Sequence, residues 1–167
     1  AFRRRMAGEA GLGDKQIAQL EDEPEPEPGK VLYWAAASGM TNEVEKLLES
    51  GLEANTEYDG KLALCVAASM GHSKTVASLV KHGADVNQPE SVGNKDTPLC
   101  YAARRGEKAT VQQLLDQGAV ALQRNAEGKS PRDLALEGGY TDIAEVLKQA
   151  EWAQWLASWE KGVVERN

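Results

Sequence analysis

Apolar residues recur along the middle of this chain in short groups at helical spacing. Leu99 and Ala102 belong to one group, and Val111 and Leu114 belong to a second group a few residues later. Positions three or four residues apart share one face of a helix, so each group predicts a short amphipathic helix. Gly106 separates the two groups, and glycine is typical of a helix end. The pattern predicts pairs of short helices joined to the next pair by a longer turn.

The same helical unit returns four times along the sequence. Its signature is two alanines followed, after two residues, by a glycine; it starts at Ala35, Ala67 and Ala102, and an imperfect copy starts at Ala135. The four glycines lie 32, 35 and 33 residues apart, at Gly39, Gly71, Gly106 and Gly139. A unit of about 33 residues cannot bury its own apolar face, so such repeats stack on their neighbours. The sequence therefore predicts an elongated stack that offers a surface for binding.

These repeats resemble the ankyrin repeat. Residues 97–103 read TPLCYAA and differ from the family's TPLHxAA opening only at Cys100, while residues 83–87 read GADVN, the usual close. Thr97-Pro98 and Ser130-Pro131 also combine a capping hydroxyl with a proline at the first helical position, which predicts two helix starts on physical grounds alone. The resemblance implies an all-α ankyrin-repeat solenoid of about four repeats, with an extended N-terminal tail and a longer C-terminal helix.

Both ends of the chain depart from the repeat. We expect an N-terminal extension over residues 1–29, the repeat domain over 30–150 and a capping or docking helix over 151–167. Residues 21–28, EDEPEPEP, predict an extended acidic segment, because alternating prolines forbid a helix. Before them, Asp14 can cap one or two helical turns that carry Ile17 and Leu20. Residues 1–5, AFRRR, resemble the targeting region of organelle-imported proteins, so the plastid stroma or mitochondrial matrix is a candidate compartment beside the cytoplasm.

Composition and charge exclude several function classes. The net charge is −7, which disfavours nucleic acid as a partner, because phosphate contacts need a basic face. Apolar residues make up 41% of the chain, but no run approaches the ~18 residues of a membrane-spanning helix. We expect protein partners, among which a membrane-bound complex is a candidate.

The residues that could carry chemistry are few. Cys65 and Cys100 occupy the same place in adjacent repeats, and stacked helices lie about 8–10 Å apart, too far for a disulfide, so both are expected to be free core thiols in a reducing, intracellular compartment. His72 and His82 are interpreted as turn residues because neither has a second ligand at i+3 or i+4. The sequence has no glycine-rich phosphate loop and no nucleophile motif. We therefore expect no enzyme activity, no cofactor and no metal.

The family resemblance implies that a partner lies along the long turns and the exposed face of the first helices. In this chain that surface comprises Tyr58, Asp59, Lys61, Ser69, Met70, Asn94, Lys95, Arg104, Arg105, Glu127 and Lys129. Residues 88–96 form the longest turn, by about two residues on the family period, and should protrude. Arg104 and Arg105, together with Lys95 and Lys129, predict a basic spot for a carboxylate-bearing partner or for the chain's own acidic segment. The alternative is that the arginines are simply solvated. Trp34 and Tyr101 are expected in the core.

The C-terminal segment carries three of the four tryptophans. The fourth repeat has Glu151 where the closing glycine is expected, so the helix should run on from Asp142 to about Lys161. Along it, one face collects Trp152, Trp155, Leu156 and Trp159. This face could cap the last repeat or dock a partner. We expect Trp152 and Trp155 to act as the cap and Trp159 to contact the partner.

Three functions remain open from the sequence. The first is a non-catalytic protein-interaction module, a small subunit, adaptor or scaffold of a larger assembly. The second is a chaperone or targeting factor that holds client proteins transiently. The third is a substrate role, since Asn87 in LVKHGADVN resembles the asparagine that is hydroxylated in other ankyrin proteins.

Overall fold

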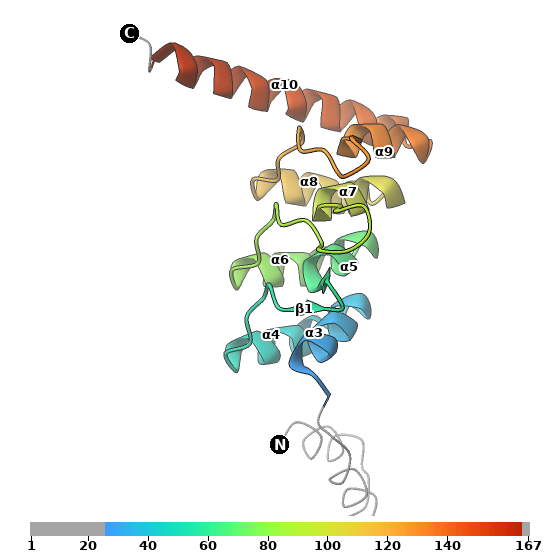
Figure 1. Cartoon of the computed structure of the whole chain (residues 1–167), viewed down its shortest axis with the longest axis vertical. Coiled ribbons are helices and arrows are strands. Elements are labelled where there is room, and N and C mark those ends of the chain that lie inside the picture. Colours follow the sequence, from blue (N-terminus) through green and yellow to red (C-terminus); the bar gives the residue numbers. More distant parts are fainter. Residues whose placement is uncertain (1–25, 165–167) are drawn as a thin grey trace, which may run out of the picture.

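The protein is a single stack of helix pairs. The computed structural model describes residues 26–164, and the side chains of residues 26–161. The described helices form four pairs, and Figure 1 shows the pairs piled one above another, each joined to the next by a longer connection. The elements are α3 (Pro28–Ala37), α4 (Thr41–Glu49), β1 (Glu57–Tyr58), β2 (Lys61–Leu62), α5 (Ala63–Ser69), α6 (Ser73–Lys81), α7 (Pro98–Arg105), α8 (Lys108–Asp116), α9 (Pro131–Glu137) and α10 (Thr141–Val164).

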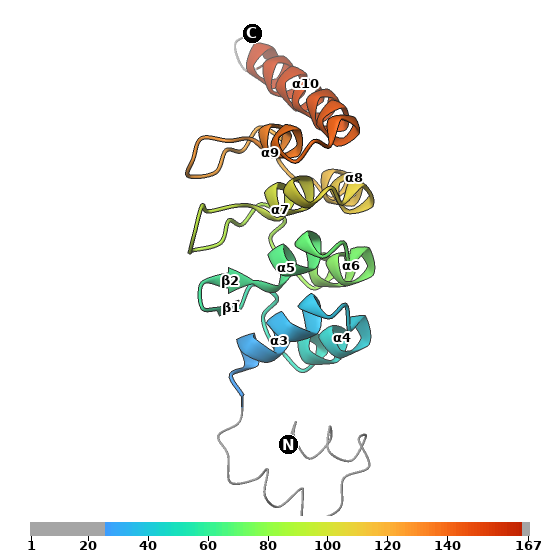
Figure 2. The ribbon, with the colours of Figure 1, turned by 90° about the vertical axis from the view of Figure 1, so that its right-hand side faces the viewer.

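The helices form two parallel columns. The first helices of the repeats, α3, α5, α7 and α9, pack on one another in order, and the second helices, α4, α6, α8 and α10, form the other column. Figure 2 shows the long connections projecting to one side of the stack, where β1 and β2 pair as a short antiparallel hairpin. The long turn of residues 88–96 projects there too, and it is tied to the hairpin below, since the Ser91 amide donates to the Gly60 carbonyl at 3.0 Å.

The core follows the repeat pattern. Ala36, Ala68 and Ala103 are fully buried between successive first helices, where only small side chains allow the close approach. The apolar stripes of the second helices are equally buried, as at Val111 and Leu114. One continuous apolar cluster therefore links all four repeats. The all-α ankyrin solenoid predicted from the sequence is confirmed.

Two helix starts form as their sequences predict. The Thr97 hydroxyl accepts the amide of Cys100 at 3.3 Å and caps α7. Ser130 caps α9 within a capping box, because its hydroxyl accepts the Asp133 amide at 3.2 Å while the Asp133 carboxylate accepts the Ser130 amide at 2.9 Å. Both helices have proline in the first turn, which fixes the backbone without losing a hydrogen bond.

In the first three repeats, the glycine after the first helix makes room for the next repeat. Gly39 has a φ of +67°, and a Cβ added to it would lie 2.9 Å from Nδ1 of His72 in the following repeat. In the same way Gly71 lies beneath the carboxylate of Glu107, and Gly106 lies beneath the ring of Tyr140. Each of these three side chains, His72, Glu107 and Tyr140, belongs to the residue directly after the glycine of its own repeat. Each therefore packs over the glycine of the repeat before it.

Side-chain amides link successive long turns on the outer side of the stack. Asn55 donates to the Gly83 carbonyl at 3.3 Å and accepts the Asp85 amide at 2.9 Å. Asn87 repeats this one level up, donating to Gly118 at 3.2 Å and accepting from Val120 at 2.8 Å. Each asparagine replaces backbone pairing that the irregular turns lack, so the turns are held in register. Asn87 thus has a structural role in the fold.

Tryptophan placement differs from expectation in three of four cases. Trp34 was expected in the core but is 57% exposed, because α3 belongs to the first described repeat and no described repeat lies before it. Trp152 and Trp155 were expected to cap the last repeat but are 64% and 52% exposed. Tyr101 is half-buried, and its hydroxyl donates to Glu90 at 2.6 Å.

Candidate functional site

The exposed apolar face of α10 is the first candidate site. We call Trp152, Trp155, Leu156 and Trp159 the tryptophan ridge; Leu156 is 48% and Trp159 is 55% exposed. The rings of Trp152 and Trp155 meet edge to face, with centroids 5.8 Å apart. Figure 1 shows α10 running on past the helices beneath it. As predicted, no glycine ends α10 near Glu151, so the helix continues and carries the ridge beyond the repeats. The expected domain boundary at residue 150 falls inside this helix.

A different face of α10 caps the stack. Ile143 and Leu147 are buried against the last repeat. Farther along, the Gln154 amide group donates to the Ala119 carbonyl and accepts the Ala121 amide, both at 2.8 Å. This amide takes the place that asparagines hold between earlier turns. Gln154 therefore fixes the rotation of α10 and leaves the tryptophan ridge outside the packed interface.

The ridge borders a shallow apolar hollow. Leu122, Glu151, Trp152 and Trp155 line a volume of about 260 Å³. Leu122 stands at the position that Asn87 occupies in the repeat below, and it is 47% exposed. Because it cannot bridge to another turn, it adds apolar surface beside the ridge. Sequence periodicity did not point to Leu122, although the loss of the repeat's asparagine could have done so.

The predicted first-helix surface begins at the β1–β2 hairpin. Tyr58 is half-buried beside Tyr33, with ring centroids 5.8 Å apart, and Lys30 lies over the Tyr58 ring at 5.9 Å. Lys61 in turn lies over the Tyr33 ring at 6.0 Å. Asp59 and Lys61 are exposed, Ser69 is half-buried and Met70 is 52% exposed.

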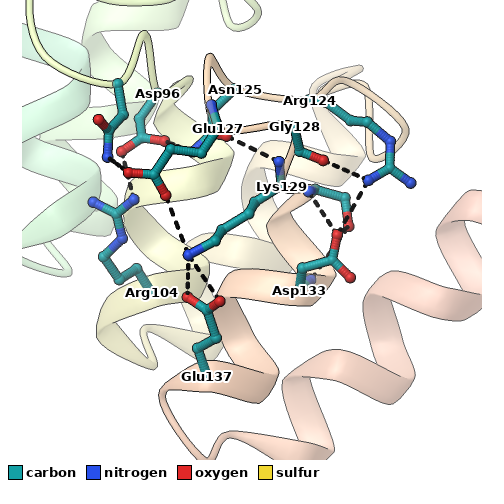
Figure 3. A network of polar contacts seen from close by, with 11 residues as sticks. Asp96, Arg104, Arg124, Asn125, Glu127, Gly128, Lys129, Asp133 and Glu137 are labelled. Atoms are coloured by element: carbon teal, nitrogen blue, oxygen red, sulfur yellow. Dashed lines mark hydrogen bonds and ion pairs between the residues drawn. The ribbon is translucent and has the colours of Figure 1, made fainter.

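The predicted residues of the third and fourth turns are joined in a polar network (Figure 3). Asn94 donates to Glu127 at 2.6 Å, and Lys129 pairs with Glu127 at 3.1 Å and with Glu137 at 2.8 Å. These two carboxylates raise the pKa of Lys129, with the Glu137 contact contributing most. The structure therefore brings Asn94, Glu127 and Lys129 together, but it pairs the lysine within the chain.

Arg104 belongs to the same network and not to an open basic spot. Its Nη2 lies 2.7 Å from Oδ2 of Asp96, a carboxylate that is only 2% exposed, and Asn125 donates to the other Asp96 oxygen at 2.7 Å. Arg105 and Lys95 remain exposed. The predicted basic spot is thus reduced to these two side chains, because Arg104 and Lys129 neutralise local carboxylates. Sequence reasoning missed the buried Asp96 and Asn125, since a polar turn gives no sign of burial.

A second buried polar contact joins Glu90 to Tyr101 of α7. Glu90 is 5% exposed and accepts the Tyr101 hydroxyl at 2.6 Å and the Leu62 amide at 3.2 Å. Burial, and then the hydrogen bond to Glu90, raises the pKa of Tyr101 well above its usual value. Cys65 and Cys100 are free and fully buried, as predicted, and burial raises the pKa of both thiols.

The described residues show neither a metal-binding cluster nor a membrane-spanning helix. Among the described residues, no cluster of three or more histidine, cysteine or acidic side chains is arranged to hold a metal ion. No helix in residues 26–164 has the length and apolar content needed to cross a membrane. The arginine-rich N-terminus, the helical turns predicted over Asp14–Leu20 and most of the acidic segment lie outside the described residues.

Comparison with known proteins supports the repeat assignment. A family model described as ankyrin repeats (3 copies) matches residues 14–90 and 88–154. Ankyrin repeat domain-containing protein 49 of Bos taurus is 39% identical over 69 residues, which are 40% of this chain and 29% of that protein. An ankyrin repeat and KH domain-containing protein of Caenorhabditis briggsae is 36% identical over 71 residues, 42% of this chain and 3% of that protein. The chain thus matches less than a third of either relative.

Proposed function

Because this chain belongs to the ankyrin-repeat family, whose members generally bind other proteins, we propose that it is a non-catalytic adaptor or small subunit of a larger assembly. The observation that carries the proposal is the tryptophan ridge on α10. Three tryptophans, each more than half exposed, lie on one helix outside the repeat core. Tryptophan is among the residues most enriched at binding hot spots, so this surface is suited to a lasting contact.

The spacing of the ridge favours a helical partner. Trp152, Trp155, Leu156 and Trp159 follow the i, i+3, i+4, i+7 pattern with which one helix packs against another. Residues 152–159 of α10 include no charged side chain, and Glu151 just before them pairs with Arg132 at 3.3 Å. The partner should therefore offer the apolar face of an amphipathic helix, and the contact should persist at high salt, because apolar contacts are not screened.

The test is to capture the tagged full-length chain from its cells and wash it with increasing salt. A subunit retains one stoichiometric partner, whereas a transient holder of clients loses a mixture of proteins. Trp155→Ala should weaken binding to a purified partner by about 2 kcal/mol, or about 30-fold in Kd. The same substitution should change the free energy of unfolding by less than about 0.5 kcal/mol, since the side chain is exposed.

Two leucines supply a matched control. Leu156 on the ridge and Leu136 on α9 are each 48% exposed. Leu156→Ala should weaken binding of the partner, and Leu136→Ala should leave the binding unchanged. Equal effects of the two substitutions would show that the ridge is not the contact surface. Loss of the partner with Arg105→Glu alone would instead assign binding to the first-helix face.

The chaperone or targeting role is the second candidate. Met70 is 52% exposed on the first-helix column, and flexible methionines suit varied clients. The chaperone or targeting role predicts that Met70→Ala, and not Trp155→Ala, reduces the range of proteins captured.

A further inference from the structure

The N-terminal end of the stack carries an apolar groove. Pro26, Val31, Trp34 and Met40 are among the residues that line it, and its volume is about 330 Å³. Trp34 is 57% and Met40 is 49% exposed. In Figure 1 this end, formed by α3 and α4, lies opposite the end formed by α10. The groove is therefore separate from the tryptophan ridge at the opposite end.

The later repeats show what such a face normally contacts. His72, Glu107 and Tyr140 each follow the glycine of their own repeat and pack over the glycine of the preceding one. Met40 has the same position in the first repeat, directly after Gly39. Within residues 26–164 no earlier unit exists for Met40 to cover. The end face is thus built as the receiving surface for a preceding unit.

We propose that residues 14–20 of the same chain occupy this groove, with Ile17 and Leu20 against Trp34 and Met40. Gly13-Asp14-Lys15 resembles Gly106-Glu107-Lys108, which leads into α8, and two apolar residues follow it. The match to the ankyrin family model begins at residue 14, well before α3 starts at Pro28. Residues 14–20 thus supply part of one more, incomplete repeat.

The connecting chain is long enough for this contact. Pro26 already lines the groove, and residues 21–25 separate it from Leu20. Five residues in a polyproline conformation span about 15 Å at 3.1 Å per residue. Adjacent packed helices lie about 8–10 Å apart, so a segment one helix away from α3 is within reach. The prolines limit the freedom of this connection and so reduce the entropy lost on docking.

Fluorescence of Trp34 tests the proposal in the full-length chain. Replacing Trp152, Trp155 and Trp159 by Phe leaves Trp34 as the only one of the four tryptophans. The three replaced side chains are exposed, so the fold should be kept, which far-UV circular dichroism checks. Acrylamide quenching then reports how much of Trp34 is open to solvent. We expect Trp34 to be strongly protected in this variant.

Aspartate substitutions identify the occupant. Ile17→Asp and Leu20→Asp should each raise the quenching constant toward that of the urea-unfolded chain. Gln16→Asp and Gln19→Asp add the same charge to the same segment and should leave quenching unchanged. The proposal is overturned if Trp34 is as accessible before the substitutions as after them, or if the two pairs of variants behave alike. Protection that grows with protein concentration would also overturn it, in favour of a second copy. None of these outcomes depends on the partner of the tryptophan ridge.

Discussion

Two adjacent arginines at the end of α7 should have unequal effects on stability. Arg104 and Arg105 look equivalent in the sequence, and both were expected to form an exposed basic spot. In the structure Arg104 pairs with the buried Asp96, whereas Arg105 is exposed. Replacing each arginine by alanine removes the same charge and the same length of side chain. The difference between the two variants therefore measures the contact with Asp96.

The expected size follows from the surroundings of Asp96. Its carboxylate is 2% exposed and has two side-chain partners, Arg104 and Asn125, each at 2.7 Å. Without the guanidinium, Asn125 would be the only one of these partners left. Breaking a fully buried ion pair costs about 3–5 kcal/mol, but the Arg104 side chain is 38% exposed, so water reduces the loss. A charged hydrogen bond of this kind is worth about 1.5–3 kcal/mol.

Thermal unfolding gives the Tm and urea unfolding gives the free energy of unfolding, each followed by far-UV circular dichroism. At about 2–4 °C per kcal/mol for a chain of this size, Arg104→Ala should lower the Tm by about 3–12 °C. Arg105→Ala should change the free energy of unfolding by less than about 0.5 kcal/mol. In the background of Asp96→Asn, the effect of Arg104→Ala should shrink, because the pair is already broken. Equal losses for the two arginine variants would refute the assignment of Arg104 to the network.

Three further predictions concern the core. Ala103→Leu should cost about 1–3 kcal/mol, because a larger side chain overpacks the contact between first helices; an unchanged melting transition would contradict the repeat register. Cys65 and Cys100 should react with a thiol reagent only as fast as the protein unfolds, since burial excludes the reagent and raises both pKa values; mass spectrometry of the labelled protein checks this. Tyr101→Phe should cost about 1–3 kcal/mol, because the buried Glu90 loses a donor.

Three titratable side chains, those of Cys65, Cys100 and Tyr101, affect the stability of the protein at alkaline pH. Burial raises the pKa values of Cys65, Cys100 and Tyr101, so the folded chain keeps protons that the unfolded chain releases. Their contribution to stability is therefore complete at neutral pH and is lost as the pH rises past the unfolded values, about 8.5 for cysteine and 10 for tyrosine. The Tm should fall above this range, and Tyr101→Phe should make the fall less steep. A flat profile up to pH 11 would contradict these pKa directions.

The sequence predicts the interior of this protein better than its ends. Ala68, Ala103 and the caps at Thr97 and Ser130 behave as expected, because each has a neighbouring repeat or a local backbone partner that its type requires. Trp34 and Trp155 do not, because helical spacing shows which residues share a face and not what covers that face. At the two ends of the described stack no further described repeat covers the end face, so helical spacing alone does not show that an apolar face there is buried.

The polar surface was predicted less well for a related reason. Asp96 and Arg104 lie in different elements, and only the stacking of two turns brings them together with Asn125. The contact between Asp96 and Asn125 spans two successive turns, and residue spacing does not contain that distance. The long helix α10 was predicted correctly from a missing glycine, but the role of Gln154 was not, because an amide on a helix has no fixed partner.

The amides that bridge the long turns determine where the array can be lengthened. Asn55 and Asn87 each bind the turn above them, so a duplicate of the second repeat inserted between them would offer the same donor and acceptor to its neighbours. Among the described residues the series ends at Gln154, which comes from a helix and binds the turn beneath it. Repeats could therefore be added within the stack, whereas a repeat fused after α10 would lack a bridging amide from the described residues to hold its long turn in register.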